Sequence, residues 1–263
     1  MNLDVNVEQT QVTSGNGKGA PQVKVSGLHK SFRDQIVLKG IDLEVGHGET
    51  LSVLGRSGTG KSVLLKLIIG LHKPDSGSIR IEGEEITKLP VKALNEVRKK
   101  MGFLFQQAAL YDSLTVAENV AFPLQRHSPK SEEHRKRHVK ELLAQVGMEN
   151  EAHKLPSEIS GGMQKRAGLA RALALEPDIL LFDEPTSGLD PITAEEICKL
   201  ILHLQKERRI TSIVVTHDMK GAQTVSDRLA LMRDGQVLIQ GTFDDLRKSQ
   251  DPFVKQFLNG SEE

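Results

Sequence analysis

The chain has 263 residues, which suits one domain with subdomains or two domains at most. Its 35 lysines and arginines equal its 35 aspartates and glutamates, so it lacks the basic excess typical of nucleic-acid-binding proteins, and no nucleic-acid partner is expected. The single cysteine, Cys198, excludes an intrachain disulfide and fits a reducing cytoplasm.

The N-terminal residues 1–21 are predicted to form a flexible lead. Residues 14–19 are polar and rich in glycine, as flexible linkers are, and the lead contains no apolar core of a signal peptide. No apolar run of the sequence approaches the roughly 20 residues that cross a bilayer. The chain is therefore expected to be soluble and to reach a membrane only through a partner.

The first third of the chain is predicted to consist mostly of strands. Alternating apolar residues are typical of half-buried strands, and a short apolar run beside glycine suits a buried strand. Residues 30–34 are predicted to form a loop. The expected strands are residues 23–28, 36–38, 41–45, 51–54 and 78–81.

A glycine-rich stretch with the pattern G-x-x-x-x-G-K-S lies between an apolar run and an aliphatic run that stops at Gly70. Strand, glycine-rich loop and helix in this order predict a phosphate site, because glycine lets the backbone curl around phosphate oxygens at the start of a helix. Lys61 can reach the β- and γ-phosphates, and the Ser62 hydroxyl can ligate Mg²⁺. An ordinary glycine turn would not need the Lys-Ser pair. The candidate nucleotide-binding residues of this loop are Gly55, Arg56, Ser57, Gly58, Thr59, Gly60, Lys61 and Ser62.

The middle of the chain changes character after a basic helix predicted at residues 91–100 and a short buried strand predicted at residues 101–105. Helical patterns and dense charges dominate from there. We therefore interpret residues 107–175, approximately, as a helical subdomain inserted into an α/β core.

The last third returns to alternating strands and helices. Residues 178–182 and 212–216 are apolar runs that suit parallel strands buried on both faces. Residues 193–206 show the periodicity of an amphipathic helix. Asp234 and Gly235 separate two alternating runs and predict a hairpin. The order predicts an α/β fold with a mainly parallel sheet and an antiparallel β edge.

Two acidic residues, Asp183 and Glu184, follow the apolar run at residues 178–182, and ligands of open α/β sheets bind at the carboxyl ends of strands. Asp183 offers Mg²⁺ a hard oxygen ligand, and Glu184 can polarise an attacking water. A loop with two surface acids is the alternative, and an apolar run that ends in Asp-Glu-Pro downstream of a phosphate loop disfavours it.

Ser160 precedes two glycines at the start of a predicted helix. A plain helix cap is the commoner meaning of Ser-Gly-Gly, and exposed N–H groups for an anion are the alternative.

These motifs, in this order, resemble those of ATP-binding-cassette (ABC) ATPases. The resemblance covers residues 23 to about 241 and implies a P-loop NTPase (RecA-like) core. It implies an ABC ATPase domain at residues 22–241, followed by a helical tail at residues 242–263. The matching positions are residues 55–62 for the Walker A loop, 159–163 for the signature, 179–184 for the Walker B strand, 187–190 for the D-loop, His217 for the switch histidine, Gln106 for the Q-loop and Phe32 for the aromatic that stacks on adenine.

The resemblance also implies a mechanism, in which two subunits close head to tail over two Mg-ATP molecules and hydrolyse them. Glu184 would orient the water, His217 would contact the γ-phosphate and hold Glu184, and Gln106 would sense Mg²⁺ and the water. The implied metal-binding residues are Ser62, Gln106 and Asp183. The residues implied to cover the γ-phosphate from the partner subunit are Ser160, Gly161 and Gly162. Met163 and Asp190 are further candidate nucleotide-binding residues.

The signature and the D-loop depart from the family pattern at three positions. Ile159 and Met163 stand where Leu and Gln are usual, and Gly188 stands where Ala is common. We expect activity to survive, because the phosphate contacts of the signature come mainly from Ser160 and backbone N–H groups.

Within the family, the segment from Tyr111 to Leu124 (residues 111–124) and the tail at residues 251–260 look most like the Mla-type, or mammalian-cell-entry (MCE), phospholipid transporter ATPases. That resemblance implies a homodimer at the cytoplasmic face of the inner membrane, a permease docked on residues 111–124, and an MCE-domain lipid-binding protein as a further partner. The alternatives are an amino-acid or lipoprotein transporter ATPase, a regulator of the cell-division type and a non-transport scaffold.

Four apolar residues of the tail, Phe253, Val254, Phe257 and Leu258, predict a narrow stripe on a helix that begins after Asp251 and stops near Gly260. The stripe either packs on its own domain or braces a partner.

Several other polar residues are interpreted without a functional role. Cys198 is predicted to be a packed side chain, His134 and His138 are predicted to lie on a solvated basic face, and Asp244 and Asp245 are predicted to start a surface helix.

Overall fold

The computed structural model describes residues 20–259. The predicted flexible lead, apart from its last two residues, and Gly260 therefore lie outside the described residues.

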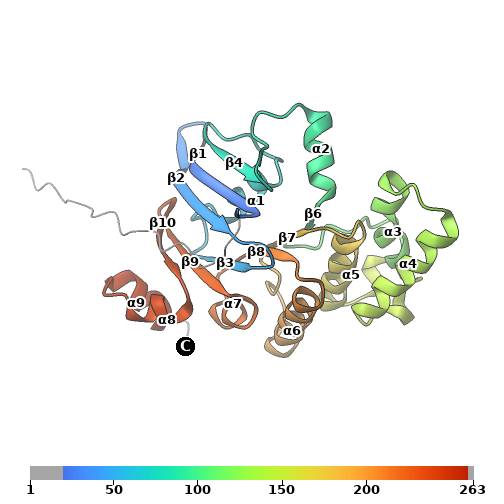
Figure 1. Cartoon of the computed structure of the whole chain (residues 1–263). Coiled ribbons are helices and arrows are strands. Elements are labelled where there is room, and N and C mark those ends of the chain that lie inside the picture. The colour runs from blue at the N-terminus through green and yellow to red at the C-terminus, as the bar shows by residue number, and fades with distance from the viewer. Residues whose placement is uncertain (1–19, 260–263) are drawn as a thin grey trace, which may run out of the picture.

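A six-stranded sheet runs through the centre of the molecule (Figure 1). Its strands are β10 (Gln236–Gly241), β9 (Arg228–Arg233), β3 (Thr50–Leu54), β8 (Thr211–Thr216), β7 (Ile179–Asp183) and β6 (Met101–Leu104), in that order across the sheet. All neighbours pair in parallel except β9 and β10. The strands β3, β7 and β8 are buried along their whole length, as expected for apolar runs covered on both faces.

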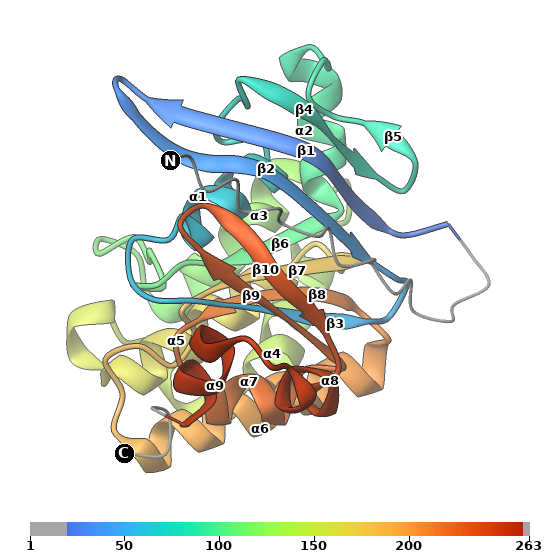
Figure 2. The same cartoon turned by 90° about the vertical axis from the view of Figure 1, so that its left-hand side faces the viewer.

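A second, antiparallel sheet lies above the main sheet in the view of Figure 2. Its strands, in order, are β2 (Gln35–Val45), β1 (Val23–Phe32), β4 (Ser76–Ile81) and β5 (Glu84–Glu85). The predicted loop at residues 30–34 is wrong: β1 continues to Phe32, which pairs with Gln35 across a two-residue turn. Register shifts interrupt the alternation of apolar and polar residues along β1. Pairing with β2 and β4 maintains the strand, and the pattern of residues does not reveal this pairing.

The helices of the described chain agree with most of the predicted helical runs. The hairpin between β9 and β10 is confirmed as well, with φ of 53° at Asp234 and 82° at Gly235, the left-handed geometry of a tight hairpin turn. The helices are α1 (Lys61–Ile68), α2 (Val91–Lys99), α3 (Val116–His127), α4 (Glu132–Gln145), α5 (Gly161–Leu173), α6 (Pro191–Arg208), α7 (Met219–Val225), α8 (Phe243–Lys248) and α9 (Pro252–Asn259), with short 3-10 turns η1 (Glu149–Glu151) and η2 (Pro156–Glu158).

The two faces of the main sheet pack against different layers. In β7, Ile179 and Leu181 join a core with α1 and the antiparallel sheet, whereas Leu180 and Phe182 join a core with α3, α4, α5 and α6. Figure 1 shows α3 and α4 beyond α5, at the end of the molecule opposite α8 and α9. The predicted boundaries of the helical subdomain, residues 107–175, stay a prediction.

Cys198 lies in the second of these cores, and burial raises the pKa of its thiol to about 11. This agrees with a packed rather than a reactive cysteine.

The C-terminal helices pack on the edge of the main sheet. Val254 of α9 is completely buried, in a third core with residues of β3, β9, α7 and α8, and Phe253, Phe257 and Leu258 pack against that core. Asp251 caps α9, as its Oδ1 accepts hydrogen bonds from the N–H groups of Phe253 and Val254 at 2.7 and 3.2 Å. The apolar stripe of the tail therefore packs on its own domain.

Within residues 20–259, none of the helices is both long and apolar enough to cross a bilayer.

Candidate active site

The phosphate loop connects β3 to α1 at the carboxyl end of the parallel strands, and its neighbours fix its shape. A Cβ on Gly55 would lie 2.7 Å from the carbonyl oxygen of Met232, and a Cβ on Gly60 would lie 2.7 Å from a methyl group of Leu38. Gly60 also has a φ of 98° and forms the N-cap of α1, a conformation that residues with a Cβ rarely adopt. The loop thus presents backbone groups at a helix N-terminus, where the dipole favours an anion.

Lys61 lies at the centre of this loop with a side chain that is 6% exposed. Its Nζ donates hydrogen bonds to the carbonyl oxygens of Gly55 at 2.7 Å and Arg56 at 3.1 Å, and it lies 3.7 Å from Oε1 of Glu184. Burial lowers the pKa of the ammonium, while the carboxylates of Glu184 and Asp183 act in the opposite direction. The nearby carboxylates therefore favour the charged form of this buried cation.

Ser62 and Asp183 form an oxygen pair next to Lys61. The hydroxyl of Ser62 donates a hydrogen bond to Oδ1 of Asp183 at 2.6 Å. Burial raises the pKa of the Asp183 carboxyl, and the hydrogen bond from Ser62 opposes the shift. A hydroxyl and a carboxylate in contact fit Mg²⁺, which in phosphate-transfer sites uses one or two carboxylates together with the phosphates of the substrate.

Three contacts hold one oxygen of the Glu184 carboxylate. Its Oε2 lies 2.9 Å from Nδ1 of His217 and accepts hydrogen bonds from the His217 N–H at 3.3 Å and the Thr216 hydroxyl at 3.2 Å. The backbone of Glu184 has a φ of 49°, which is uncommon for a residue with a Cβ. An oriented, nearly buried carboxylate of this kind can serve as a general base or can position a water molecule.

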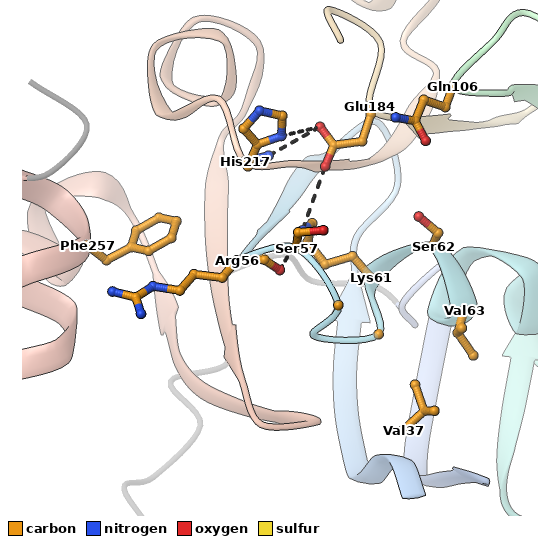
Figure 3. A pocket seen from close by; sticks show the side chains of 12 residues that line it. Val37, Arg56, Ser57, Lys61, Ser62, Val63, Gln106, Glu184, His217 and Phe257 are labelled. Atoms are coloured by element: carbon orange, nitrogen blue, oxygen red, sulfur yellow. Dashed lines mark hydrogen bonds and ion pairs between the residues drawn. The ribbon is translucent and has the colours of Figure 1, made fainter. Parts of the chain in front are cut away.

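Lys61, Ser62, Glu184 and His217 line one pocket of about 550 Å³, whereas Asp183 lies behind Ser62 and is not among its lining residues. Figure 3 shows Lys61 pointing toward Glu184, with His217 and Gln106 on either side of that carboxylate. The Nε2 of Gln106 donates a hydrogen bond to the Ser187 hydroxyl at 3.3 Å. The lining residues are Val37, Arg56, Ser57, Gly58, Gly60, Lys61, Ser62, Val63, Gln106, Glu184, His217 and Phe257.

Three of these lining residues, Val37, Val63 and Phe257, were not among the candidate site residues, and Val63 directly follows Ser62 in the sequence. Val37 lies in a predicted strand and Phe257 in the predicted apolar stripe of the tail, but neither pattern indicates that the side chain reaches the phosphate loop. Phe257 lies beside Arg56 in Figure 3, and the neighbouring Phe253 ring lies 5.6 Å from the Arg56 guanidinium.

The signature and D-loop residues are not among the lining residues of this pocket. Ser160 caps α5, accepting a hydrogen bond from the N–H of Met163 at 3.3 Å, and Asp190 caps α6. Ser160, Gly161 and Asp190 are exposed. Gly162 has no room for a side chain, because a Cβ there would lie 2.5 Å from a methyl group of Thr193. These residues form a surface with two helix N-termini rather than a part of this pocket.

Phe32 is also absent from the pocket lining. Its ring is 40% exposed, packs edge to face on His72 with ring centres 5.3 Å apart, and lies 5.2 Å from the ammonium of Lys30. Its predicted role in stacking on adenine stays a prediction.

Comparison with known proteins identifies the family. A model described as ABC transporter matches residues 38–187, more than half of the chain. The chain belongs to the ABC transporter family. The intermembrane phospholipid transport ATP-binding protein MlaF of Haemophilus influenzae is 41% identical over 90% of this ABC chain and 90% of its own length. The methionine import ATP-binding protein MetN of Brucella abortus is 40% identical over 90% of this chain and 63% of its own length.

The mycobacterial protein Mkl, described as a probable ribonucleotide transport ATP-binding protein, is 44% identical over 90% of this chain in Mycobacterium tuberculosis. The chain spans 66% of the length of that relative.

Two solved ABC structures confirm the predicted P-loop α/β fold. A dimeric cassette in a post-hydrolysis state with ADP and Pi is 36% identical and has a TM-score of 0.77 over 84% of this chain and 98% of its own. A cassette from Clostridium perfringens, part of the cbiONQ transporter complex, is 32% identical and has a TM-score of 0.80 over 91% of this chain and 96% of its own.

Proposed function

We propose that this chain binds and hydrolyses ATP as the nucleotide-binding subunit of an ABC transporter. One observation carries the proposal: Lys61 of the phosphate loop and Glu184 at the end of β7 meet in a single pocket, 3.7 Å apart. A cation for the terminal phosphates and a carboxylate for the attacking water are the two groups that hydrolysis of a phosphoanhydride needs close together.

In this proposal the residues in and around the pocket have different roles. Glu184 orients the attacking water, and His217 holds that carboxylate through its Nδ1 at 2.9 Å. Ser62, Asp183 and Gln106 hold Mg²⁺, which, when bound, neutralises charge on the phosphate oxygens. The backbone of residues 55–60 surrounds the phosphates, and Phe32 stacks on the adenine.

Two copies of the chain complete two composite sites in this proposal. Ser160, Gly161 and Asp190 are exposed at the starts of α5 and α6, where the helix dipoles favour an anion. In this proposal the anion is the ATP bound to a second copy of the chain. A 36% identical cassette whose solved structure is dimeric supports this arrangement.

We also propose that residues 111–124 dock on a membrane permease at the cytoplasmic face of the inner membrane. Asn119, completely buried, fixes the shape of this segment: its Oδ1 accepts a hydrogen bond from the Tyr111 N–H at 2.7 Å, and its amide donates to the carbonyl oxygens of Tyr111 and Leu114. The Tyr111 side chain is 47% exposed and packs on Phe122. A preformed loop with an exposed tyrosine suits an interface anchor.

Phospholipid is the substrate that we propose for the transporter, with an MCE-domain protein as a further partner. The support is the 41% identity to MlaF over nearly the full length of both chains. Methionine import, the printed role of a 40% identical relative, is the alternative substrate class, and a non-transport scaffold is the alternative function.

Co-purification and genetics separate these functions. A transporter subunit should recover a multi-span permease from membranes, and Tyr111→Ala should reduce that recovery more than it lowers the melting temperature. Capture without any membrane subunit would favour a scaffold. Deletion of the gene in a Gram-negative host should increase detergent sensitivity, whereas a defect in amino-acid uptake with an intact envelope would favour the alternative substrate.

A further inference from the structure

Lys165, on the first turns of α5, is a buried cation with no place in the mechanism above. It is 5% exposed. Its Nζ donates hydrogen bonds to the backbone carbonyl oxygen of Gln106 at 2.5 Å and to that of Glu184 at 3.1 Å. One side chain of α5 therefore touches both the segment that leaves β6 and the end of β7. A buried lysine is rare unless it is paired, so these two contacts need an explanation.

The contact with Glu184 falls on a strained part of the backbone. Glu184 has a φ of 49°, and residues held in sparsely populated conformations persist only when their surroundings fix them. The Glu184 N–H donates to the carbonyl oxygen of Val215 at 2.9 Å, and the Glu184 carbonyl accepts from the N–H of Ser187 at 3.2 Å and from Lys165. These contacts set the direction in which the Glu184 carboxylate points toward Lys61 and His217.

A second cation of α5, Arg171, forms hydrogen bonds close to the contact between Lys165 and Gln106. Arg171 donates hydrogen bonds to the carbonyl oxygens of Ala108 and Ala109 at 2.5 and 2.6 Å, and both alanines have positive φ, 56° and 49°. Lys165 and Arg171 thus fasten the same backbone segment, residues 106–109, to α5. They differ in one respect, because Lys165 also bonds to Glu184.

We propose that Lys165 is a positioning residue that couples α5 to the catalytic machinery by holding the backbones of Gln106 and Glu184 in one fixed relation. The proposal rests on the proposed hydrolysis of ATP. The N-terminus of α5 carries Ser160, so a displacement of this helix on closure of two subunits reaches Glu184 through Lys165. Burial lowers the pKa of the ammonium, and the carboxylates of Asp183 and Glu184 counteract this.

Substitution by a residue of similar size without donors tests the proposal. Lys165→Met should lower kcat for ATP about 10- to 100-fold, since small misplacements of catalytic groups have effects of this order, with KM for ATP changed less than about threefold. Lys165→Gln keeps an amide that can donate to carbonyl oxygens and should recover part of the lost kcat. Arg171→Met is the matched control, because it also removes α5 donors to residues 106–109, and it should lower kcat by less than Lys165→Met.

Amide hydrogen exchange provides a readout that does not depend on activity. Lys165→Met should increase exchange at residues 106–109 and at residues 184–187, whereas Arg171→Met should increase it at residues 106–109 alone. Equal losses of kcat in both variants, or unchanged exchange at residues 184–187 in Lys165→Met, would overturn the proposal. Absence of turnover in the wild-type chain with its membrane subunit would instead overturn the proposed function. If Lys165→Met does not fold, Lys165→Gln is measured in its place.

Discussion

The ammonium of Lys61 lies 3.7 Å from a carboxylate oxygen of Glu184, although the two residues are 123 positions apart in the sequence (184 − 61). Lys61 follows β3 and Glu184 follows β7, and β8 lies between these two strands in the main sheet. Both side chains are nearly buried. Opposite charges at this distance stabilise each other in a poorly hydrated site, so loss of either one removes a favourable interaction of the other.

Lys61→Ala should abolish ATP binding or turnover, because it removes the buried cation at the centre of the phosphate loop. Equilibrium titration with a fluorescent ATP analogue and a phosphate-release assay measure the two effects. Lys199→Ala, which removes an exposed lysine of α6 that pairs with Glu195, is the control. Normal turnover by pure Lys61→Ala protein would remove the phosphate site from this loop.

Asp183→Asn should raise the melting temperature at neutral pH in the absence of nucleotide. Burial raises the pKa of this carboxyl, so the folded state disfavours its charged form. The resulting loss of stability is absent below the pKa of the unfolded chain and develops as pH rises through the higher folded pKa. The gain in melting temperature from the substitution should therefore shrink as pH falls into the carboxyl range.

Asp190→Asn is the control of opposite sign. Hydrogen bonds from Thr193 lower the pKa of the Asp190 carboxyl, so its charge stabilises the fold above the ordinary pKa, and that contribution is lost as pH falls. Asp190→Asn should thus lower the melting temperature at neutral pH.

Asp183→Asn should also reduce the stabilisation by Mg²⁺, measured as the melting temperature with ATP and Mg²⁺ minus that with ATP and EDTA. An unchanged Mg²⁺ effect would contradict the metal assignment.

A mixed dimer tests whether Ser160 acts across two subunits. Lys61→Ala in one copy and Ser160→Arg in the other should leave one intact composite site, whereas both substitutions in one copy, paired with wild type, should damage both sites. ATP turnover of the two purified heterodimers should therefore differ. Identical turnover would rule out the head-to-tail arrangement.

Removal of the tail after Gln250 should lower the melting temperature of the isolated chain. Val254 is completely buried, and burial of one aliphatic side chain contributes about 2 kcal/mol, which corresponds to roughly 5 °C in a chain of this size. Lys255→Ala, an exposed change on the same helix, should leave the melting temperature within about 1 °C, as surface substitutions usually do. A truncated chain that melts like wild type but fails to assemble with the membrane subunit would favour a role for α9 in bracing a partner.

The sequence predicted the parts of the fold that local patterns determine. The phosphate loop was recognisable because its glycines, Lys61 and Ser62 are contiguous, and β7 because an apolar run suits burial on both faces. Residues 30–34 were misassigned because pairing with β2, rather than alternation, extends β1 to Phe32.

The pocket was predicted less completely than the motifs. Val37 and Phe257 reach it through tertiary packing of β2 and α9, which no local pattern specifies. Lys165 was missed because a lysine in a helical run reads as exposed, although Gly162 and Leu169, on the same face of α5, are buried.

Phosphate release from Mg-ATP by the full chain, wild type against Glu184→Gln, tests the central claim most directly. Glutamine keeps the shape of the side chain but cannot act as a base, so kcat should fall at least about 100-fold while ATP binding persists. Size-exclusion chromatography should then show a dimer of Glu184→Gln that forms with Mg-ATP and is absent without it. Hydrolysis by Glu184→Gln at the wild-type rate would contradict the assignment of this pocket as the site of ATP hydrolysis.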